Sequence, residues 1–282
     1  GTIATEVPPY STFRVGDTLK IQAEVFGHHG EVANGELKVG DSVATEVNGA
    51  VRAATMFNHS ATHLLHAALR QVLGNHVQQK GSLVDETRTR FDFSHPKAVS
   101  KDEIKEIESL VNMHSLNNSQ VTTDLMKLDD AIAMGAEAMF GEKYDDDVRV
   151  LSMSDGFSVE LCGGTHVART GDIGMFIITS ESSVSSGVRR IEATVGTKAV
   201  ELMLEMQHQL QTTQVLLNVG ASEVSSKVKD LIAENKSLKK GKKTNQTSSI
   251  EAKDSRHQLD GCELVLLQVE NQNIQDLRQL VD

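Results

Sequence analysis

Two short motifs with the same internal spacing, far apart in the chain, place the tightest limit on its fold. The first, HSATH, contains His59 and His63, and the second, CGGTH, contains Cys162 and His166. Three imidazoles and one thiolate suit borderline-soft Zn(II) in tetrahedral geometry and are poor ligands for hard cations. The motifs can share an ion only if the fold brings them to one point.

The first motif lies on an expected amphipathic helix. In NHSATHLLHAALRQVLG the apolar residues recur at helical spacing, and Asn58 and Gly74 are suited to its two caps. Residues four apart share a helix face, so His59 and His63 project side by side, on a stripe with His66 that points away from the apolar stripe. An isolated pair of this kind is commonly a solvated polar face. We interpret His66 as a residue that contacts the ligands or lies at the surface, and not as a fifth ligand.

The second motif makes a metal site the better interpretation. Cys162 and His166 follow a strand-like run, and the two glycines between them permit a tight turn that lets both side chains converge. A zinc peptidase would carry Glu directly after its first histidine, where this chain has Ser60. The zinc deaminase signature, H-x-E with P-C-x-x-C, is also absent from the sequence. Both of those chemistries are therefore disfavoured.

The order of the remaining segments predicts an α+β fold. Short alternating runs separated by turn residues favour an all-β module at the start of the chain, and mixed strand-like and helical segments then favour an antiparallel α+β sandwich. Helical patterning follows from about residue 197, with a short heptad-like seam and a polar linker. We expect four modules: a small β-barrel (1–54), an α+β core (55–196), a helical arm with linker (197–250) and the truncated start of a further domain (251–282).

Composition excludes several other classes of protein. No apolar run approaches the ~20 residues that span a bilayer, so no membrane segment is expected. Two cysteines cannot form a disulfide framework, which fits a cytoplasmic chain, and Cys262 in its apolar run is expected to be buried. The net charge of -11 argues against coating nucleic acid through the overall field, so local basic residues must make any RNA contact.

Several of these motifs together resemble a known family. NHSATHLLHAALRQVLG followed by VQQKGSLV, and ELCGGTH followed by TGDIG and GVRRIEA, closely resemble the editing domain of bacterial alanyl-tRNA synthetases. The likeness covers residues 1–195 and, more loosely, the helical arm and the start of the C-terminal domain. Threonyl-tRNA synthetase editing domains share both motifs, but they typically carry proline before the last histidine, where this chain has Thr165.

The resemblance implies a β-barrel packed on an editing core, and an activity that removes serine or glycine from the acceptor end of mischarged tRNA(Ala). Thr62 matches the threonine whose hydroxyl meets the side chain of misattached serine, and Gln79 matches a glutamine needed for deacylation. Zinc is implied to organise the pocket, with activation of a water as the alternative. The implied zinc ligands are His59, His63, Cys162 and His166.

Contacts to tRNA and assembly are less determined by the sequence. Pairing with neighbouring acidic residues explains the nearby basic residues as well as phosphate contacts do. The core that would attach alanine with ATP and magnesium is absent from these residues, and self-association through the helical arm or the missing C-terminal domain is expected. A free-standing trans-editing deacylase and a non-catalytic zinc-stapled tRNA-binding module remain alternatives. The basic residues proposed for tRNA are Lys80, Arg88, Arg90, Arg189 and Arg190.

Overall fold

The computed structural model describes residues 1–22, 25–138, 144–245 and 253–268. The chain divides into two compact units, Gly1–Glu205 and Met206–Asp282. Helices and antiparallel sheets both contribute, which confirms the expected α+β class. In the part of the chain that the structure describes, no helix is long and apolar enough to cross a membrane.

Four antiparallel strands form the N-terminal module, in the order β3-β2-β1-β4. The alternating runs and turn residues of this segment predict such pairing, and the all-β module is present as expected. Among the described residues its strands form an open sheet, with β3 and β4 at the edges, and no pairing closes it into a barrel. The strands are β1 (Thr2–Thr5), β2 (Thr12–Gln22), β3 (Val25–Asn34) and β4 (Val43–Glu46).

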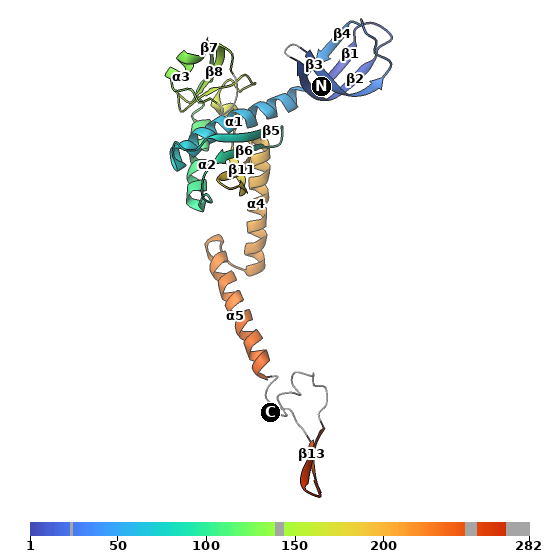
Figure 1. Ribbon diagram of the computed structural model, residues 1–282, viewed down its shortest axis with the longest axis vertical. Helices are drawn as coiled ribbons and strands as arrows, with labels where there is room; N and C mark the ends of the chain where they lie inside the picture. The colour runs from blue at the N-terminus through green and yellow to red at the C-terminus, as the bar shows by residue number, and fades with distance from the viewer. Residues whose placement is uncertain (23–24, 139–143, 246–252, 269–282) are drawn as a thin grey trace. The chain divides into compact units, whose positions relative to one another are not determined.

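One long helix, α1 (Gly49–Leu73), carries the first motif through the core (Figure 1). The side chain of Asn48 caps its start, and Gly74 ends it at a φ of 112°, a conformation open to glycine at little cost. The helix starts well before Asn58, the expected cap, because residues 50–57 contain neither Gly nor Pro. The expected module boundary at residue 54 therefore lies inside α1.

A four-stranded antiparallel sheet, in the order β10-β11-β6-β5, supports α1 and α2. The hydrophobic runs predict three of these strands, whereas β5 was missed because QKGSLV is short of apolar residues and contains a glycine. The elements are β5 (Gln79–Val84), β6 (Thr89–Ser94), α2 (Lys101–Leu116), β10 (Phe176–Ser185) and β11 (Val188–Val195).

A second sheet, in the order β7-β8-β9, positions the other motif. Its last strand packs against α1, so Cys162, which follows that strand directly, is delivered to the helix. The helical pattern of residues 128–138 predicts a longer helix than α3, which ends at Ala133 because Gly135 adopts a φ of 85°. The elements are β7 (Thr122–Lys127), α3 (Leu128–Ala133), β8 (Asp147–Met153) and β9 (Ser158–Leu161).

One hydrophobic core joins α1, α2, the four-stranded sheet and the short helix η1 (Thr170–Ile173). Leu65 of α1 and Phe91 of β6 are fully buried within it. Burial along α1 is continuous from residue 60 to residue 66, so the helix is enclosed on every side there. His63 and His66 are buried, so the histidine stripe, which lies opposite the apolar stripe, is also covered and is not a solvated face.

The second unit begins at Met206, inside the helix α4 (Gly196–Leu217). The helical pattern expected from residue 197 is confirmed by α4 and by a second long helix. Cys262 is exposed at the start of a hairpin strand, where a buried position was expected. The run CELVLLQVENQNIQDLRQLVD predicts a strand followed by a helix, and that helix falls outside the described residues. The further elements are η2 (Ala221–Glu223), α5 (Val224–Asn245), β12 (Lys253–Leu259) and β13 (Cys262–Gln268).

Truncating a buried leucine of α1 tests the importance of this core. Leu65 is 0% exposed, so Leu65→Ala is expected to lower the free energy of unfolding by about 2–5 kcal/mol through lost burial and an unfilled cavity. Leu216 of α4 is 80% exposed, and Leu216→Ala should change it by less than about 0.5 kcal/mol. Urea denaturation followed by circular dichroism measures both, and equal effects would contradict the assigned core.

Candidate metal centre

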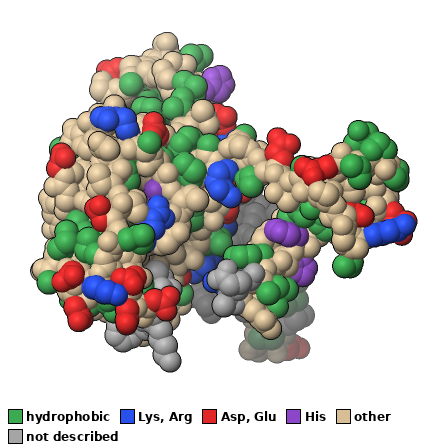
Figure 2. Space-filling model, turned by 90° about the horizontal axis from the view of Figure 1, so that it is seen from above, with side chains coloured by type: hydrophobic (Ala, Val, Ile, Leu, Met, Phe, Trp, Pro, Cys, Tyr) green, Lys and Arg blue, Asp and Glu red, His purple; other side chains and the backbone are tan. Residues whose placement is uncertain are grey.

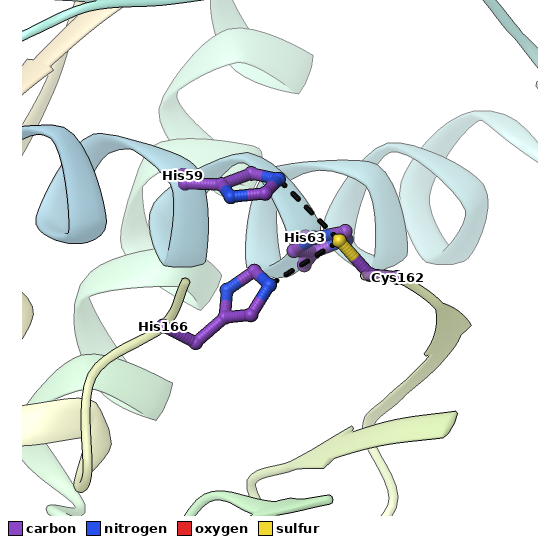
Figure 3. Close-up of side chains that lie close together, drawn as sticks. All are labelled: His59, His63, Cys162 and His166. Atoms are coloured by element: carbon purple, nitrogen blue, oxygen red, sulfur yellow. Dashed lines mark hydrogen bonds between the residues drawn. The ribbon is translucent and has the colours of Figure 1, made fainter. Parts of the chain in front are cut away.

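The two motifs meet between α1 and the loop after β9 (Figure 3). One ligand atom from each of four side chains lies within 4.8 Å of the other three. The sulfur of Cys162 is 3.6 Å from Nε2 of His59 and 3.2 Å from Nε2 of His166. Zinc–ligand bonds of ~2.0–2.3 Å in a tetrahedron separate the ligands by roughly 3.3–3.8 Å. The cluster, His59, His63, Cys162 and His166, therefore has about the dimensions of a zinc cage.

The loop that carries Cys162 and His166 depends on a glycine close to α1. A Cβ atom on Gly164 would lie 2.3 Å from Cε1 of His59, so any side chain there would collide with a ligand ring. The carbonyl of Gly164 accepts a hydrogen bond from the guanidinium of Arg149, and the backbone N–H of Cys162 donates to the Arg149 carbonyl over 3.0 Å. The close approach of loop and helix thus requires glycine, and strand β8 holds the loop in place.

Neighbouring side chains orient two of the imidazoles. Nδ1 of His63 lies 2.5 Å from a carboxylate oxygen of Glu160, and Nδ1 of His166 lies 3.2 Å from the hydroxyl of Ser60. In both rings Nε2 is left to the cluster. Nε2 of His63 is buried and has no hydrogen-bond partner among the described residues. A buried imidazole nitrogen without a partner is costly, and a cation bound at this point would satisfy it, so the residues present fit a zinc ion.

The charges of the site also suit a cation. Burial favours the neutral thiol of Cys162, but hydrogen bonds from His166 and His59 outweigh it and lower the pKa of Cys162 to about 3. Burial lowers the pKa of His63, but the neighbouring Glu160 carboxylate outweighs it and raises that pKa to about 10, so a cation that binds at Nε2 of His63 must displace a proton. The cysteine is thus held as the thiolate, the form that binds metal.

Thr62, expected to recognise serine, lies buried on α1 beside the cluster residues. Its hydroxyl donates to the carbonyl of Asn58 over 2.8 Å and shares a hydrogen bond of 2.5 Å with the hydroxyl of Thr89. Because one hydroxyl has a single hydrogen to donate, Thr89 must be the donor to Thr62. Thr62 therefore keeps one acceptor lone pair beyond these two bonds.

Gln79, the second residue expected to act in deacylation, begins the edge strand β5. Its side-chain amide donates to the hydroxyl of Ser82 over 3.1 Å. It is not one of the four clustered residues.

Three of the five basic residues expected to contact tRNA pair with carboxylates, and two of these pairs, at Arg189 and Arg190, are the less exposed ones. Arg189 contacts Glu181 at 2.5 Å, and both side chains are largely buried. Arg190 forms a two-pronged pair with Asp92, at 2.7 and 2.8 Å. In both pairs the N–H donors of the guanidinium already face carboxylate oxygens, so neither side chain is free to bind a phosphate.

The other three basic residues lie on β5 and β6 or between them. Arg88 pairs with Glu192 at 2.9 Å, and the ammonium of Lys80 donates to the side chain of Gln78 over 3.4 Å. Nε of Arg90 is buried and has no hydrogen-bond partner among the described residues. Figure 2 shows basic and acidic side chains interspersed on the face it presents, so any RNA contact relies on individual residues.

Glu160 is a part of the site that the sequence did not single out, and it contacts His66, which the sequence analysis placed beside the ligands or at the surface. Both oxygens of Glu160 are used, one by His63 and the other by Nδ1 of His66 at 3.0 Å. The charged neighbours and these hydrogen bonds lower the pKa of Glu160 to about 2, against the effect of burial. A signal was available, because Glu160 is an acidic residue inside an apolar strand run, two positions before Cys162 and so on the same strand side.

Comparison with known proteins agrees with this architecture. Residues 148–192, from β8 through most of β11, match the domain family described as the "Threonyl and Alanyl tRNA synthetase second additional domain". The second motif, with Cys162 and His166, falls inside this range. This part of the chain is thus similar to the additional domain that the family description assigns to threonyl- and alanyl-tRNA synthetases.

Nearly the whole chain also matches one part of known alanine–tRNA ligases. It is 46% identical over 276 residues to the alanine–tRNA ligase of Nitrosomonas eutropha, a match that covers 96% of this chain and 32% of that protein. It is 52% identical over 228 residues to those of Burkholderia mallei and Burkholderia pseudomallei, covering 81% of this chain and 26% of each relative. The chain belongs to the alanyl-tRNA synthetase family and spans about a third of the length of the curated relatives it matches.

The two cysteines offer a matched test of the cluster. Cys162→Ala removes the sulfur ligand, so zinc content after dialysis against a mild chelator is expected to fall from about one per chain to below about a tenth. Cys262→Ala, at an exposed position of the hairpin, should retain the wild-type content. Elemental analysis of the purified proteins measures this, and equal zinc content in the two variants would contradict the site.

Proposed function

We propose that this chain hydrolyses the ester bond of tRNA(Ala) that carries serine or glycine in place of alanine, as the editing part of an alanyl-tRNA synthetase. The observation that carries the proposal is the convergence of the two motifs on one cation-sized cluster. Its support is the sequence match to alanine–tRNA ligases and to their additional domain. Attachment of alanine with ATP and magnesium is proposed only for the parent protein, because this chain covers about a third of its relatives.

The proposed chemistry needs positioned groups more than a strong nucleophile. An aminoacyl ester is activated enough that a placed water can cleave it if the developing oxyanion is stabilised. The four clustered residues would hold zinc, which would organise the pocket and supply a Lewis acid for the substrate's amino group. We assign to Gln79 the role of a hydrogen-bond donor in deacylation, on the resemblance of QQKGS to the family motif.

Selectivity against serine is proposed to come from Thr62. Its hydroxyl donates to Asn58 and accepts from Thr89, which leaves one lone pair for the hydroxyl of a misattached serine. Alanine has no hydroxyl to offer, and a site built around a hydrogen bond discriminates strongly against a substrate that leaves its polar group unpaired. Removal of glycine cannot use this contact and must depend on the size of the pocket or on the placement of water.

The proposed partner is the acceptor end of tRNA(Ala). Among the five basic residues, Arg90 is the strongest candidate for a phosphate contact, since the residue is partly exposed and forms no ion pair among the described residues. Lys80 and Arg88 lie nearby in the same pair of strands or their connection. Arg189 and Arg190 would have to exchange a carboxylate for a phosphate, so we propose that they shape the sheet face instead.

Hydrolysis of seryl-tRNA tests the proposed activity directly. The full chain loaded with zinc is expected to deacylate Ser-tRNA(Ala) and spare Ala-tRNA(Ala). Cys162→Ala should lower the rate by at least about a hundredfold because the pocket loses its organising ion, while Cys262→Ala should not. The loss of acid-precipitable radioactivity from labelled aminoacyl-tRNA over time measures these rates. Binding of tRNA without hydrolysis by wild-type protein would instead support a non-catalytic zinc module.

Replacing Thr62 tests the source of selectivity. Thr62→Val keeps the shape but removes the hydroxyl, so hydrolysis of Ala-tRNA(Ala) relative to Ser-tRNA(Ala) is expected to rise by about tenfold or more. Thr55 is a matched control, because its hydroxyl makes the same kind of bond to the carbonyl four residues before it. Thr55→Val should leave the ratio unchanged. The assignment is wrong if Thr62→Val still spares Ala-tRNA and clears Ser-tRNA at the normal rate.

A further inference from the structure

A single buried carboxylate connects two histidines of α1. Glu160 on β9 is 7% exposed, and its two oxygens are divided between Nδ1 of His63 at 2.5 Å and Nδ1 of His66 at 3.0 Å. A carboxylate can only accept hydrogen bonds, so each histidine must carry its hydrogen on Nδ1. In the neutral ring, which is the form that binds metal, the arrangement therefore selects the tautomer of His63 with Nε2 open.

This tautomer is the one that the cluster requires. Nε2 of His63 and Nε2 of His66 are both buried without a hydrogen-bond partner among the described residues, and only that of His63 belongs to the group of four ligand atoms within 4.8 Å of one another. Without the carboxylate the ring could rotate or move its hydrogen to Nε2, and either change would remove a ligand. A ligating histidine whose other nitrogen donates to a carboxylate is held in both respects.

His66 completes the arrangement from the other side. Its ring is buried and lies 5.2 Å from the ring of Phe91, measured between centroids. If His66 were absent, one oxygen of Glu160 would be buried without its donor, and the carboxylate could turn away from His63. His66 thus holds Glu160 in the orientation that serves the metal ligand.

We propose that Glu160 is a positioning residue of the metal centre, anchored by His66 so that it fixes His63 with Nε2 toward the cation. The inference rests on the proposed metal centre, but it does not depend on which ester the centre acts upon. Glu160 also lines a cavity of about 280 Å³ with Arg70 and Gln71 of α1, so proton transfer from that cavity is the competing role. Metal affinity separates the two roles. If Glu160 acted only as a proton acceptor for the reaction, replacing it would leave the metal affinity unchanged.

Co(II) binding to the full chain tests the inference without any tRNA. Dissociation constants come from chelator competition, and the visible absorption band reports the ligand geometry. The variants are Glu160→Gln, His66→Phe and the double variant. Glu137→Gln is the matched control, because Glu137 forms a β-bridge with Glu160, lines the same cavity and pairs instead with Arg70 at 2.7 Å.

Glu160→Gln is expected to weaken Co(II) binding by about 10- to 100-fold and to alter the band. His66→Phe should weaken it by about threefold, and this effect should vanish in the Glu160→Gln background, because both residues act through one carboxylate. Glu137→Gln should bind as wild type. Such a result supports the inference even if the chain hydrolyses no ester.

Wild-type Co(II) affinity and spectrum in Glu160→Gln, with or without a loss of hydrolysis, would overturn the inference. A wild-type chain that binds no Co(II) would overturn the metal centre and this role together. If circular dichroism shows that Glu160→Gln does not fold, His66→Phe decides alone. An unchanged affinity and band in that variant contradict the role, and a weakened, altered site supports it.

Discussion

The enclosure of α1 between the four-stranded sheet and β9 is the constraint on which the site depends. Leu65 and its neighbours bury the helix against β6 and α2, while the opposite stripe, with His63 and His66, is covered by Glu160 of β9. A helix packed on one side only would leave those imidazoles in water. Their rings could then rotate, and the hydrogen could lie on either ring nitrogen. Because both sides are closed, four side chains from two distant motifs are held with one possible ligand atom each within 4.8 Å of the others.

Burying so many polar groups is costly unless each is matched. The thiolate of Cys162 is balanced by imidazoles, and Glu160 is balanced by two donors, so the site holds opposite charges close together in a poorly solvated place. The nitrogen of His63 that remains unmatched is the feature that points to a cation. Gly164 adds the steric side of the same argument, because only its missing side chain lets the loop approach His59.

Much of this could be predicted from local patterns. Helical periodicity predicted the helix that carries His59 and His63, and the strand-like runs predicted β6, β8, β9 and β11 close to their observed bounds. The start of α1 was misplaced because a good cap residue, Asn58, lies inside a longer stretch of helix formers. Whether the basic residues are open to RNA could not be predicted, since Arg189 and Arg190 are paired with carboxylates from neighbouring strands.

The sequence by itself determined which atoms could form the site, because residue type sets ligand chemistry and a four-residue spacing sets which side chains share one turn of a helix. It also determined the likeness to alanyl-tRNA synthetases. Only the tertiary structure decided that the histidine stripe is buried, that Glu160 joins His63 to His66, and that Thr62 is paired with Thr89. These contacts link residues that are distant along the chain, and their distances depend on how sheets and helices pack, which no local pattern of residues encodes.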